Sequence, residues 1–459
     1  MRRFFYFAFI CSSCWVLVFA AMCRAQTDSP TEMHLSLREC IDLALEENSQ
    51  IVQNRFGVSV ADVQVESARN AFLPSLTSSY RLSRQLTGPR EGSFVDQATG
   101  EIITTLGDSE TSGSQSVGAS VSMDLYNPSN WANLSASKHG RKVAEMNLNT
   151  EEQQVVLQVK QGYFGLLQAI KLMQVQEEEV AVSEEDLRRA ETLYEIHSVP
   201  LSDVLSTRAT LESGRAALIE RQNSVEVARV DLAFVMGSRL GVRLIPSEVE
   251  FEIRPLTLSL EEALDWALEN RADLQSREFA LRQAQDELKA TQYGVRHPTL
   301  SMSAGYSWQL TTREDFGGLA DLFEKNYGYS LNFNVNLPIF NRMSTENAVK
   351  TQKLNYLRSV EELEQAKRQV ELDIRRTFMN IEQFRRSIEA NEAAVRAAEE
   401  SFKLAQERYD FGTGTQLERL QAQSSLFGAR NNLVQAMFNY HLQLAQLEQA
   451  MGGLILEER

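Results

Sequence analysis

The 459-residue sequence predicts an α+β membrane protein with an internal duplication, in which long antiparallel coiled-coil helices adjoin four β-strands. The duplication is visible as two similar segments, LSLRECIDLALEE from Leu35 and LSLEEALDWALEN from Leu258. The helices are indicated by heptad repeats in two proline-free stretches, residues 130–197 and 342–411. The strands are indicated by alternating apolar and polar residues, which point to opposite faces of a sheet.

The first 25 residues have the features of a secretory signal peptide. Arg2 and Arg3 precede an uncharged apolar run, and small residues follow it. This order predicts cleavage after Ala25. Two alternatives are an uncleaved anchor helix and a lipoprotein that is cut before Cys23. No later segment carries 18 consecutive apolar residues, and a chain cut after Ala25 keeps only Cys40, so no internal disulfide is expected.

The predicted domain order follows the duplication. The offset between the copies is 223 residues at their starts and 215 along the long helices, where Gln168 matches Gln383. The first repeat is 26–240 and contains a helix, a β-hairpin at 75–126 and a long helical hairpin at 129–237. A linker at 241–257 leads to the second repeat, 258–452, which contains a helix, a β-hairpin at 299–340 and a long helical hairpin at 342–451. A tail at 453–459 ends the chain.

The strand NYGYSLNFNVNLPIF, residues 326–340, shows the alternation most clearly. Its apolar positions include Leu331, Phe333 and Val335, and the positions between and after them are Asn332, Asn334 and Asn336. Two structures suit such a strand: an antiparallel sheet of a soluble domain, or the wall of a membrane β-barrel. Polar segments at 87–113 and from 311 to about 325 are expected to be the loops of the two β-hairpins.

Four strands from one chain cannot close a membrane barrel. Long helices flank each strand pair, so the strands gather at one end of a rod. An open sheet edge in lipid would leave backbone groups unpaired at several kcal/mol each, so other chains must add strands. Three copies would give twelve strands, an even number within the usual bacterial range.

The helical stretches carry two tracks with a period of seven. The main track is apolar, for example at Val159, Leu166 and Val180 and again at Ile374, Ile381 and Ile388. The second track is small or polar, for example at Gln176 and Ser183. Two tracks favour helices that each pack on two neighbours, as in the wall of a ring, although an ordinary antiparallel coiled-coil hairpin would share the main track.

Together these features resemble the TolC-type outer-membrane efflux proteins, the outer membrane factor family. The resemblance rests on the signal peptide, the duplicated order, LSLEEALDWALEN, LPIF at 337–340 and the helix turns at Tyr194 and Tyr409. It implies a homotrimer whose twelve-stranded barrel crosses the outer membrane of a Gram-negative bacterium and continues as an α-helical barrel into the periplasm. It also implies passive export of drugs, metals or other toxic compounds, with a periplasmic adaptor protein and an inner-membrane pump, proton-driven or ABC-type.

The resemblance assigns roles to particular residues. In the barrel, Leu331, Phe333 and Val335 would face outer-membrane lipid, and Asn332, Asn334 and Asn336 would face the lumen. At the periplasmic tip, the pore-constriction positions match Asp203, Glu418 and Gln421. The tip positions that would contact the adaptor match Tyr194, Pro200, Tyr409, Gly412 and Gly414.

The match at the tip is incomplete. Gln421 has no charge where the family has a second acid, and Gly414 stands where the family has an arginine that helps to hold the pore shut. Three Glu418 side chains near one axis would repel one another and attract cations. Glu418 is equally well explained as an exposed acid that is favourable at a helix start.

Composition and motifs exclude several classes of function. A net charge of −16 argues against a nucleic-acid partner, which needs a basic surface. The sequence has no GxxxxGK[ST] loop, and its five histidines form no HExxH motif, so neither an enzyme nor a cofactor is expected. The alternatives to small-molecule efflux are a channel for type I protein secretion and a periplasmic coiled-coil scaffold without a pore.

Overall fold

A computed structural model of the chain describes residues 32–98, 100–238, 243–247, 258–312, 327–340 and 342–453. The expected signal peptide lies outside these residues, as do most of the expected linker 241–257, most of the second β-hairpin loop and the tail after 453. Within the described residues, no helix is both long and apolar enough to cross a membrane.

The same order of elements occurs twice. The first half contains α2 (Leu37–Glu47), α3 (Ser49–Asn70), β2 (Ser75–Thr87), β5 (Glu110–Tyr126), α4 (Pro128–Glu195) and α5 (Leu201–Val235). The second half contains α6 (Leu260–Asn270), α7 (Ala272–Arg296), β7 (Thr299–Thr312), β8 (Tyr327–Asn336), α9 (Ser344–Asp410) and α10 (Gln416–Ala450). A short parallel pair, β1 (Glu32–Leu35) and β6 (Arg243–Pro246), joins the start of the described chain to the segment between the halves. The predicted fold class, α+β with an internal duplication, is confirmed.

The short helices begin with the same cap in both halves. Ser36 caps α2 in a capping box with Glu39, and Ser259 caps α6 in a capping box with Glu262. In this motif each partner satisfies a backbone N–H group that the first helical turn leaves unpaired. The cap therefore accounts for the matching start of the two repeats.

The returning long helices also end alike, at Gly237 and Gly452. Both glycines have positive φ, +73° and +89°. A Cβ atom at Gly237 would lie 2.6 Å from the carbonyl oxygen of Glu47, and one at Gly452 would lie 3.0 Å from that of Asn270. Only glycine therefore allows each long hairpin to close against the end of its short helix.

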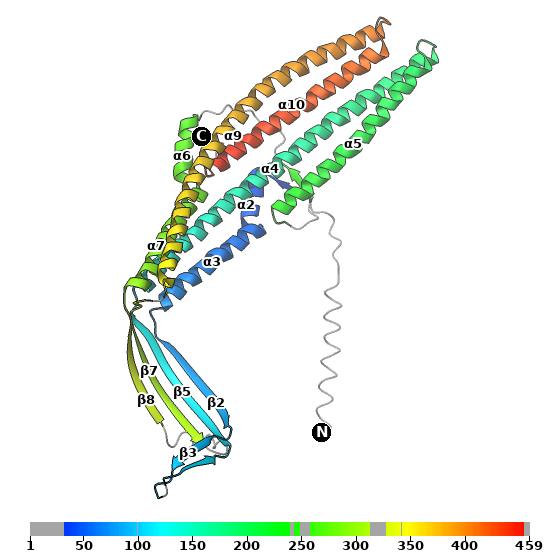
Figure 1. Cartoon of the computed structure of the whole chain (residues 1–459). Helices are drawn as coiled ribbons and strands as arrows, with labels where there is room; N and C mark the ends of the chain where they lie inside the picture. The colour runs from blue at the N-terminus through cyan, green and yellow to red at the C-terminus, as the bar shows by residue number, and fades with distance from the viewer. Residues whose placement is uncertain are drawn as a thin grey trace, which may run out of the picture.

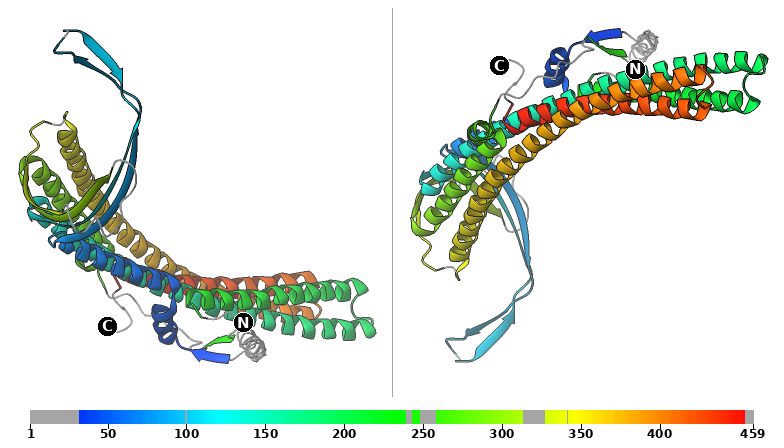
Figure 2. Two further views of the ribbon diagram at one scale, coloured as in Figure 1. Left: turned by 90° about the horizontal axis from the view of Figure 1, so that it is seen from below. Right: turned by 90° about the horizontal axis from the view of Figure 1, so that it is seen from above.

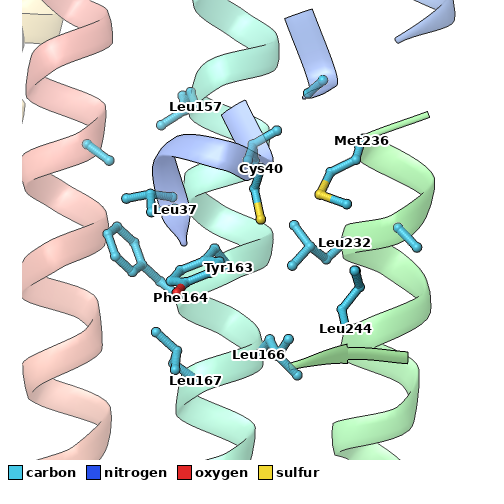
Figure 3. Packing of buried hydrophobic residues seen from close by; sticks show 14 of the residues in the cluster. Leu37, Cys40, Leu157, Tyr163, Phe164, Leu166, Leu167, Leu232, Met236 and Leu244 are labelled. Atoms are coloured by element: carbon cyan, nitrogen blue, oxygen red, sulfur yellow. The ribbon is translucent and has the colours of Figure 1, made fainter. Parts of the chain in front are cut away.

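The long helices bury their apolar heptad track within one chain. Buried members are Val159 and Leu166 of α4, Leu232 of α5, Ile374 and Ile381 of α9, and Tyr440 and Leu447 of α10. Figure 3 shows the core of the first half, where Leu37 and Cys40 of α2 lie among Tyr163 and Phe164 of α4 and Leu232 of α5. The burial of each side chain of this size stabilises the fold by about 1.5–3 kcal/mol. Apolar contacts along these seams therefore hold the helices of each hairpin together.

Four strands form one antiparallel sheet in the order β2–β5–β7–β8. The register aligns side chains of one kind across all four strands. One row is apolar and consists of Leu76, Val121, Ala304 and Leu331; the adjacent row is polar and consists of Ser75, Ser122, Ser303 and Asn332. The sheet therefore has one apolar and one polar face.

A separate small hairpin, β3 (Glu91–Val95) and β4 (Ile102–Leu106), lies in the segment 87–113, where a loop is expected from the sequence. Its turn is closed by a hydrogen bond of 2.9 Å from the Asp96 N–H group to the Glu101 carbonyl oxygen. Each strand has only five residues, EGSFV and IITTL, and neither alternates apolar with polar side chains. So short a pattern is not distinguishable from a polar loop in the sequence.

The helices form one curved layer whose order matches that of the sheet (Figures 1 and 2). Near the sheet the order is α3–α4–α7–α9, and toward the far end it is α5–α4–α10–α9. Helices α3 and α7 lead into β2 and β7, whereas α4 and α9 follow β5 and β8. Each strand of the sheet therefore continues a helix of the layer.

Candidate pore constriction at the helical tips

Two helical turns form the end of the molecule opposite the sheet (Figure 1). Both are capped by a residue in the left-handed region, His197 with φ 61° in the first and Gly412 with φ 70° in the second. In each turn the next residue donates a backbone hydrogen bond across the cap, from Ser198 to Leu193 at 2.8 Å and from Thr413 to Arg408 at 2.9 Å. The chain thus makes one turn geometry twice, although only the second turn has the glycine that this backbone favours.

The three candidate constriction residues lie close to these turns. Asp203 is half-buried in the first turn of α5, and Glu418 and Gln421 are exposed, one turn apart, near the start of α10. Glu418 forms a capping box with Thr415, and its carboxylate lies 3.6 Å from the Arg408 guanidinium. A helix-start role therefore accounts for Glu418 in the single chain, and its exposure leaves it available to line a pore.

Tyr409 connects the two turns electrostatically. Burial raises the pKa of the Tyr409 phenol, and the nearby charge of Asp203 raises this pKa further. The two residues belong to different hairpins, Tyr409 to α9 and Asp203 to α5, so the charge at one helical turn acts on a group at the other. Asp203 and Tyr409 are thus linked only by this electrostatic influence, while Glu418 and Gln421 are exposed to solvent.

The remaining tip candidates differ in exposure. Tyr194, Pro200 and Gly412 are exposed, and Gly414 is half-buried. A Cβ atom at Gly414 would lie 3.1 Å from the Cβ atom of Arg408 and 3.2 Å from its carbonyl carbon. The turn therefore has little room for an arginine side chain at position 414.

A buried polar cluster behind the tip has no counterpart among the predicted site residues. Its centre is Arg419, which contacts Asp186 of α4, and Gln416 donates a hydrogen bond of 2.8 Å to Thr207 of α5. The second heptad track, which is small or polar at Ser183, lies on this side of α4. Asp186 and Arg419 stand among other charged residues, so the sequence does not distinguish them as a buried pair. In the described part of the chain, no three His, Cys, Asp or Glu side chains gather to hold a metal ion.

The candidate lipid-facing and lumen-facing residues occupy opposite faces of β8. Leu331, Phe333 and Val335 pair with Ala304, Met302 and Leu300, whereas Asn332, Asn334 and Asn336 pair with Ser303, Ser301 and Thr299. All six of these β8 residues are exposed in the single chain. Neither face of the strand is therefore covered by the chain itself.

The comparison with known families gives a match over both halves. A family model described as "Outer membrane efflux protein" matches residues 40–238 and 263–453. The chain belongs to this family. Its two matched segments correspond to the two halves of the duplicated fold.

Related outer membrane efflux proteins cover nearly the whole chain. The "Outer membrane protein TolC" of Vibrio cholerae serotype O1 is 24% identical over 421 residues, 91% of each protein. The "Outer membrane efflux protein BepC" of Brucella suis biovar 1 is 25% identical over 449 residues, 97% of this chain and 92% of the relative. The solved Campylobacter jejuni CmeC outer membrane channel has the same fold, with a TM-score of 0.75 at 19% identity over 93% of this chain and 90% of that one.

Family membership settles the class and the location of the protein. An outer membrane efflux protein is a channel protein of the outer membrane of a Gram-negative bacterium, and it is not an enzyme. The sheet and the helical layer described above are therefore parts of a transport channel.

Proposed function

We propose that this protein is the outer-membrane duct of a tripartite efflux system for small toxic compounds, and that three copies form the duct. The observation that carries this proposal is the sheet, which has two open edges and two faces of opposite character. A periplasmic adaptor protein and an inner-membrane pump would complete the system, and the pump would supply the energy.

The open edges support a ring of identical chains. Among the described strands, β2 and β8 each have one neighbour, and they run in opposite directions because the sheet is antiparallel throughout. The β8 edge of one chain can therefore pair with the β2 edge of the next in the same antiparallel pattern. Such head-to-tail contacts close into a ring, and three chains would give a twelve-stranded barrel, within the usual bacterial range.

The apolar face supports contact with lipid. On this face Tyr306, Trp308 and Tyr327 cluster toward the free end of the sheet, and at the other end Tyr126 of β5 lies near Trp131 of α4. The rows from Leu300 to Trp308 span about 27 Å at about 3.4 Å per residue, close to the apolar band of about 25 Å between aromatic girdles. The Asn-lined face would then surround a wet lumen.

The lateral edges of the helical layer carry exposed apolar side chains. On α3, at one edge, Phe56, Val60 and Val63 are more than half exposed, and on α9, at the other edge, Leu354 and Met379 are more than half exposed. Exposed apolar side chains that gather along an edge are typical of an interaction surface. The ring that pairs β8 with β2 would also bring α9 of one chain against α3 of the next.

We further propose that the tip is the narrow end of the duct, with Asp203, Glu418 and Gln421 at the constriction. Glu418 side chains from three chains near one axis would favour cations over anions. The exposed turn residues Tyr194, Pro200 and Gly412, together with Tyr409 and Gly414, would form the surface that meets the adaptor.

The decisive experiment measures assembly and conductance together. Protein extracted from outer membranes with detergent is expected to have the mass of three chains by native mass spectrometry and to produce channel events in planar lipid bilayers. A water-soluble monomer without conductance would contradict the proposal and would favour a periplasmic scaffold. Loss of the gene is then expected to sensitise cells to several small toxic compounds, and a secretion defect alone would point to a protein-export channel.

A further inference from the structure

One charged residue interrupts the apolar face of the sheet. Strand register and alternation place Arg84 of β2 on this face, between Leu82 and Leu86 along the strand. Among the positions of this face on the four described strands, Arg84 is the one charged residue, and the others are apolar, aromatic or uncharged. A charge on a surface that meets lipid needs a partner of opposite charge or contact with water.

The depth of Arg84 in a membrane follows from the register. An aromatic-rich row crosses all four strands and consists of Tyr80, Val117, Trp308 and Tyr327. Arg84 lies four residues beyond Tyr80, toward the free end of the sheet (Figure 1). Four residues span about 14 Å along a strand, or about 10 Å along the membrane normal at a tilt of about 45°.

This depth corresponds to the lipid head groups. In the proposed barrel, the row that contains Tyr80 is the outer aromatic girdle, at the boundary of the hydrocarbon. The headgroup layer adds about 5–7 Å beyond that boundary. The long, flexible side chain of an arginine can direct its charged end toward such a layer, so the Arg84 guanidinium can reach the head groups.

The described part of the chain offers Arg84 no counter-charge. Arg84 is exposed, and it forms no ion pair with another described residue. The nearest acid on the facing strand is Glu110, but it pairs with Thr87 and therefore lies on the polar face. Gly113, which pairs with Arg84, has no side chain to occupy the space beside the guanidinium. The guanidinium is therefore accessible to a ligand.

The surroundings of Arg84 suit a ligand that carries both a phosphate and acyl chains. A guanidinium binds phosphate through two parallel hydrogen bonds, for which its planar fork is well shaped. At the level of the head groups, anionic lipids are the source of negative charge around a membrane protein. Nearer the helices on the same strand, Leu82 and Tyr80 are at least half exposed and apolar, which suits contact with acyl chains.

We propose that Arg84 binds the phosphate group of an outer-leaflet lipid whose acyl chains cover Tyr80 and Leu82. This inference rests on the proposed channel function, which places the free end of the sheet at the outer leaflet. Because β2 is an edge strand that would pair with β8 of the next chain, the acyl chains would also contact the exposed Tyr327 and Tyr329 of that chain. The bound lipid would thus join neighbouring chains.

The test compares Arg84→Gln with a matched control, Arg81→Gln. Arg81 is also an exposed arginine of β2, but it lies on the polar face. The trimer, purified from outer membranes and exchanged into detergent, is titrated with phosphorylated lipid A, and binding is measured by native mass spectrometry. Arg84→Gln is expected to raise the Kd by roughly tenfold or more, the factor that corresponds to one charge-assisted hydrogen bond. Arg81→Gln is expected to stay within about threefold of the wild type.

Two further ligands distinguish a lipid site from a general anion site. Lipid A without its phosphate groups is expected to bind the wild type as weakly as phosphorylated lipid A binds Arg84→Gln, because only the acyl contacts remain. Phosphorylated lipid A should raise the temperature at which the wild-type trimer dissociates, whereas inorganic phosphate should not. These comparisons use the wild type alone, so they keep the test valid if Arg84→Gln does not assemble.

Three outcomes would overturn the lipid site. One is equal affinity of Arg84→Gln and Arg81→Gln for phosphorylated lipid A, and another is equal affinity of the wild type for lipid A with and without phosphate. The third is stabilisation of the trimer by inorganic phosphate alone, which would indicate a general anion site. In all three, a trimer that conducts in planar bilayers leaves the proposed channel function in place. A wild type that forms neither trimers nor channels would instead overturn the channel function, and the lipid site with it.

Discussion

The helical hairpins and the sheet differ in whether the single chain buries their apolar side chains. In the hairpins, Ile374 and Leu447 are fully buried by contacts within one chain. In the sheet, Leu331, Phe333 and Val335 remain more than half exposed, and the opposite face is polar. The difference teaches that the hairpins cover their apolar track within a single chain, whereas the sheet leaves its apolar face uncovered, as the proposed lipid-facing barrel wall requires.

The largest effect is expected from a substitution that disrupts the apolar face of the sheet alone. Replacing both Leu331 and Phe333 by Asp would place two charges per chain against lipid, where a charge at mid-depth costs up to about 2–4 kcal/mol, acids less than bases. We expect loss of outer-membrane insertion and of export, measured by membrane fractionation and bilayer conductance. Far-ultraviolet circular dichroism should still show the helices.

The matched control for this prediction lies on the other face of the same strand. Asn332→Asp with Asn334→Asp adds the same number of charges where water is expected, so insertion should be preserved. If the Leu331 and Phe333 variant inserts normally, or if both double variants fail alike, the assignment of the two faces is wrong.

An intermediate effect is expected in the hairpins. Ile374→Ala removes a fully buried side chain from the apolar seam of α9, which typically costs about 2–5 kcal/mol of unfolding free energy. Glu400→Ala, at an exposed position of the same helix, should change this free energy by about 0.5 kcal/mol or less. Thermal unfolding followed by circular dichroism in detergent measures both, and equal melting temperatures would show that the seam is not the source of helical stability.

A smaller, pH-dependent effect is expected at His441 of α10. Burial lowers the pKa of this imidazole from its ordinary 6.5 to about 4, so the ring is neutral in the folded chain. As the pH falls below 6.5, the unfolded chain binds a proton that the folded chain does not, and stability is lost until the pH reaches about 4. The loss should approach about 3 kcal/mol per chain.

The measurement is the difference in melting temperature between the wild type and His441→Phe at pH 7.5 and at pH 5. Phenylalanine keeps the ring, which lies 5.8 Å from that of Phe164, but cannot take up a proton. The wild type should lose more stability on acidification than the variant. An identical loss in both would assign the acid sensitivity to other groups.

The parts of the fold that the sequence predicts are those with a local period. Val159 and Leu166 are buried because one face of their own helix is buried, and Leu331 and Phe333 share a face because strand side chains alternate. The hairpin β3–β4 is missed because its strands are too short to show a period. Patterns therefore predict elements and faces, and the fold class follows from them.

The candidate site is predicted less completely because it depends on distant partners. Asp186 and Arg419 are separated by 233 residues, and each stands among other charged residues on its helix. No local pattern distinguishes a buried charge from a solvated one in such surroundings. Glu418, in contrast, is visible as a helix-start acid, and its role at the constriction stays a prediction.

The repetition of one cap in the two tip turns has a consequence for how many partner molecules can bind. Three chains would present six similar turns, three centred on His197 and three on Gly412. A partner that recognises only the shared backbone shape would find six nearly equivalent places around the rim. A partner that recognises Pro200, which is present in the first turn only, would find three binding places.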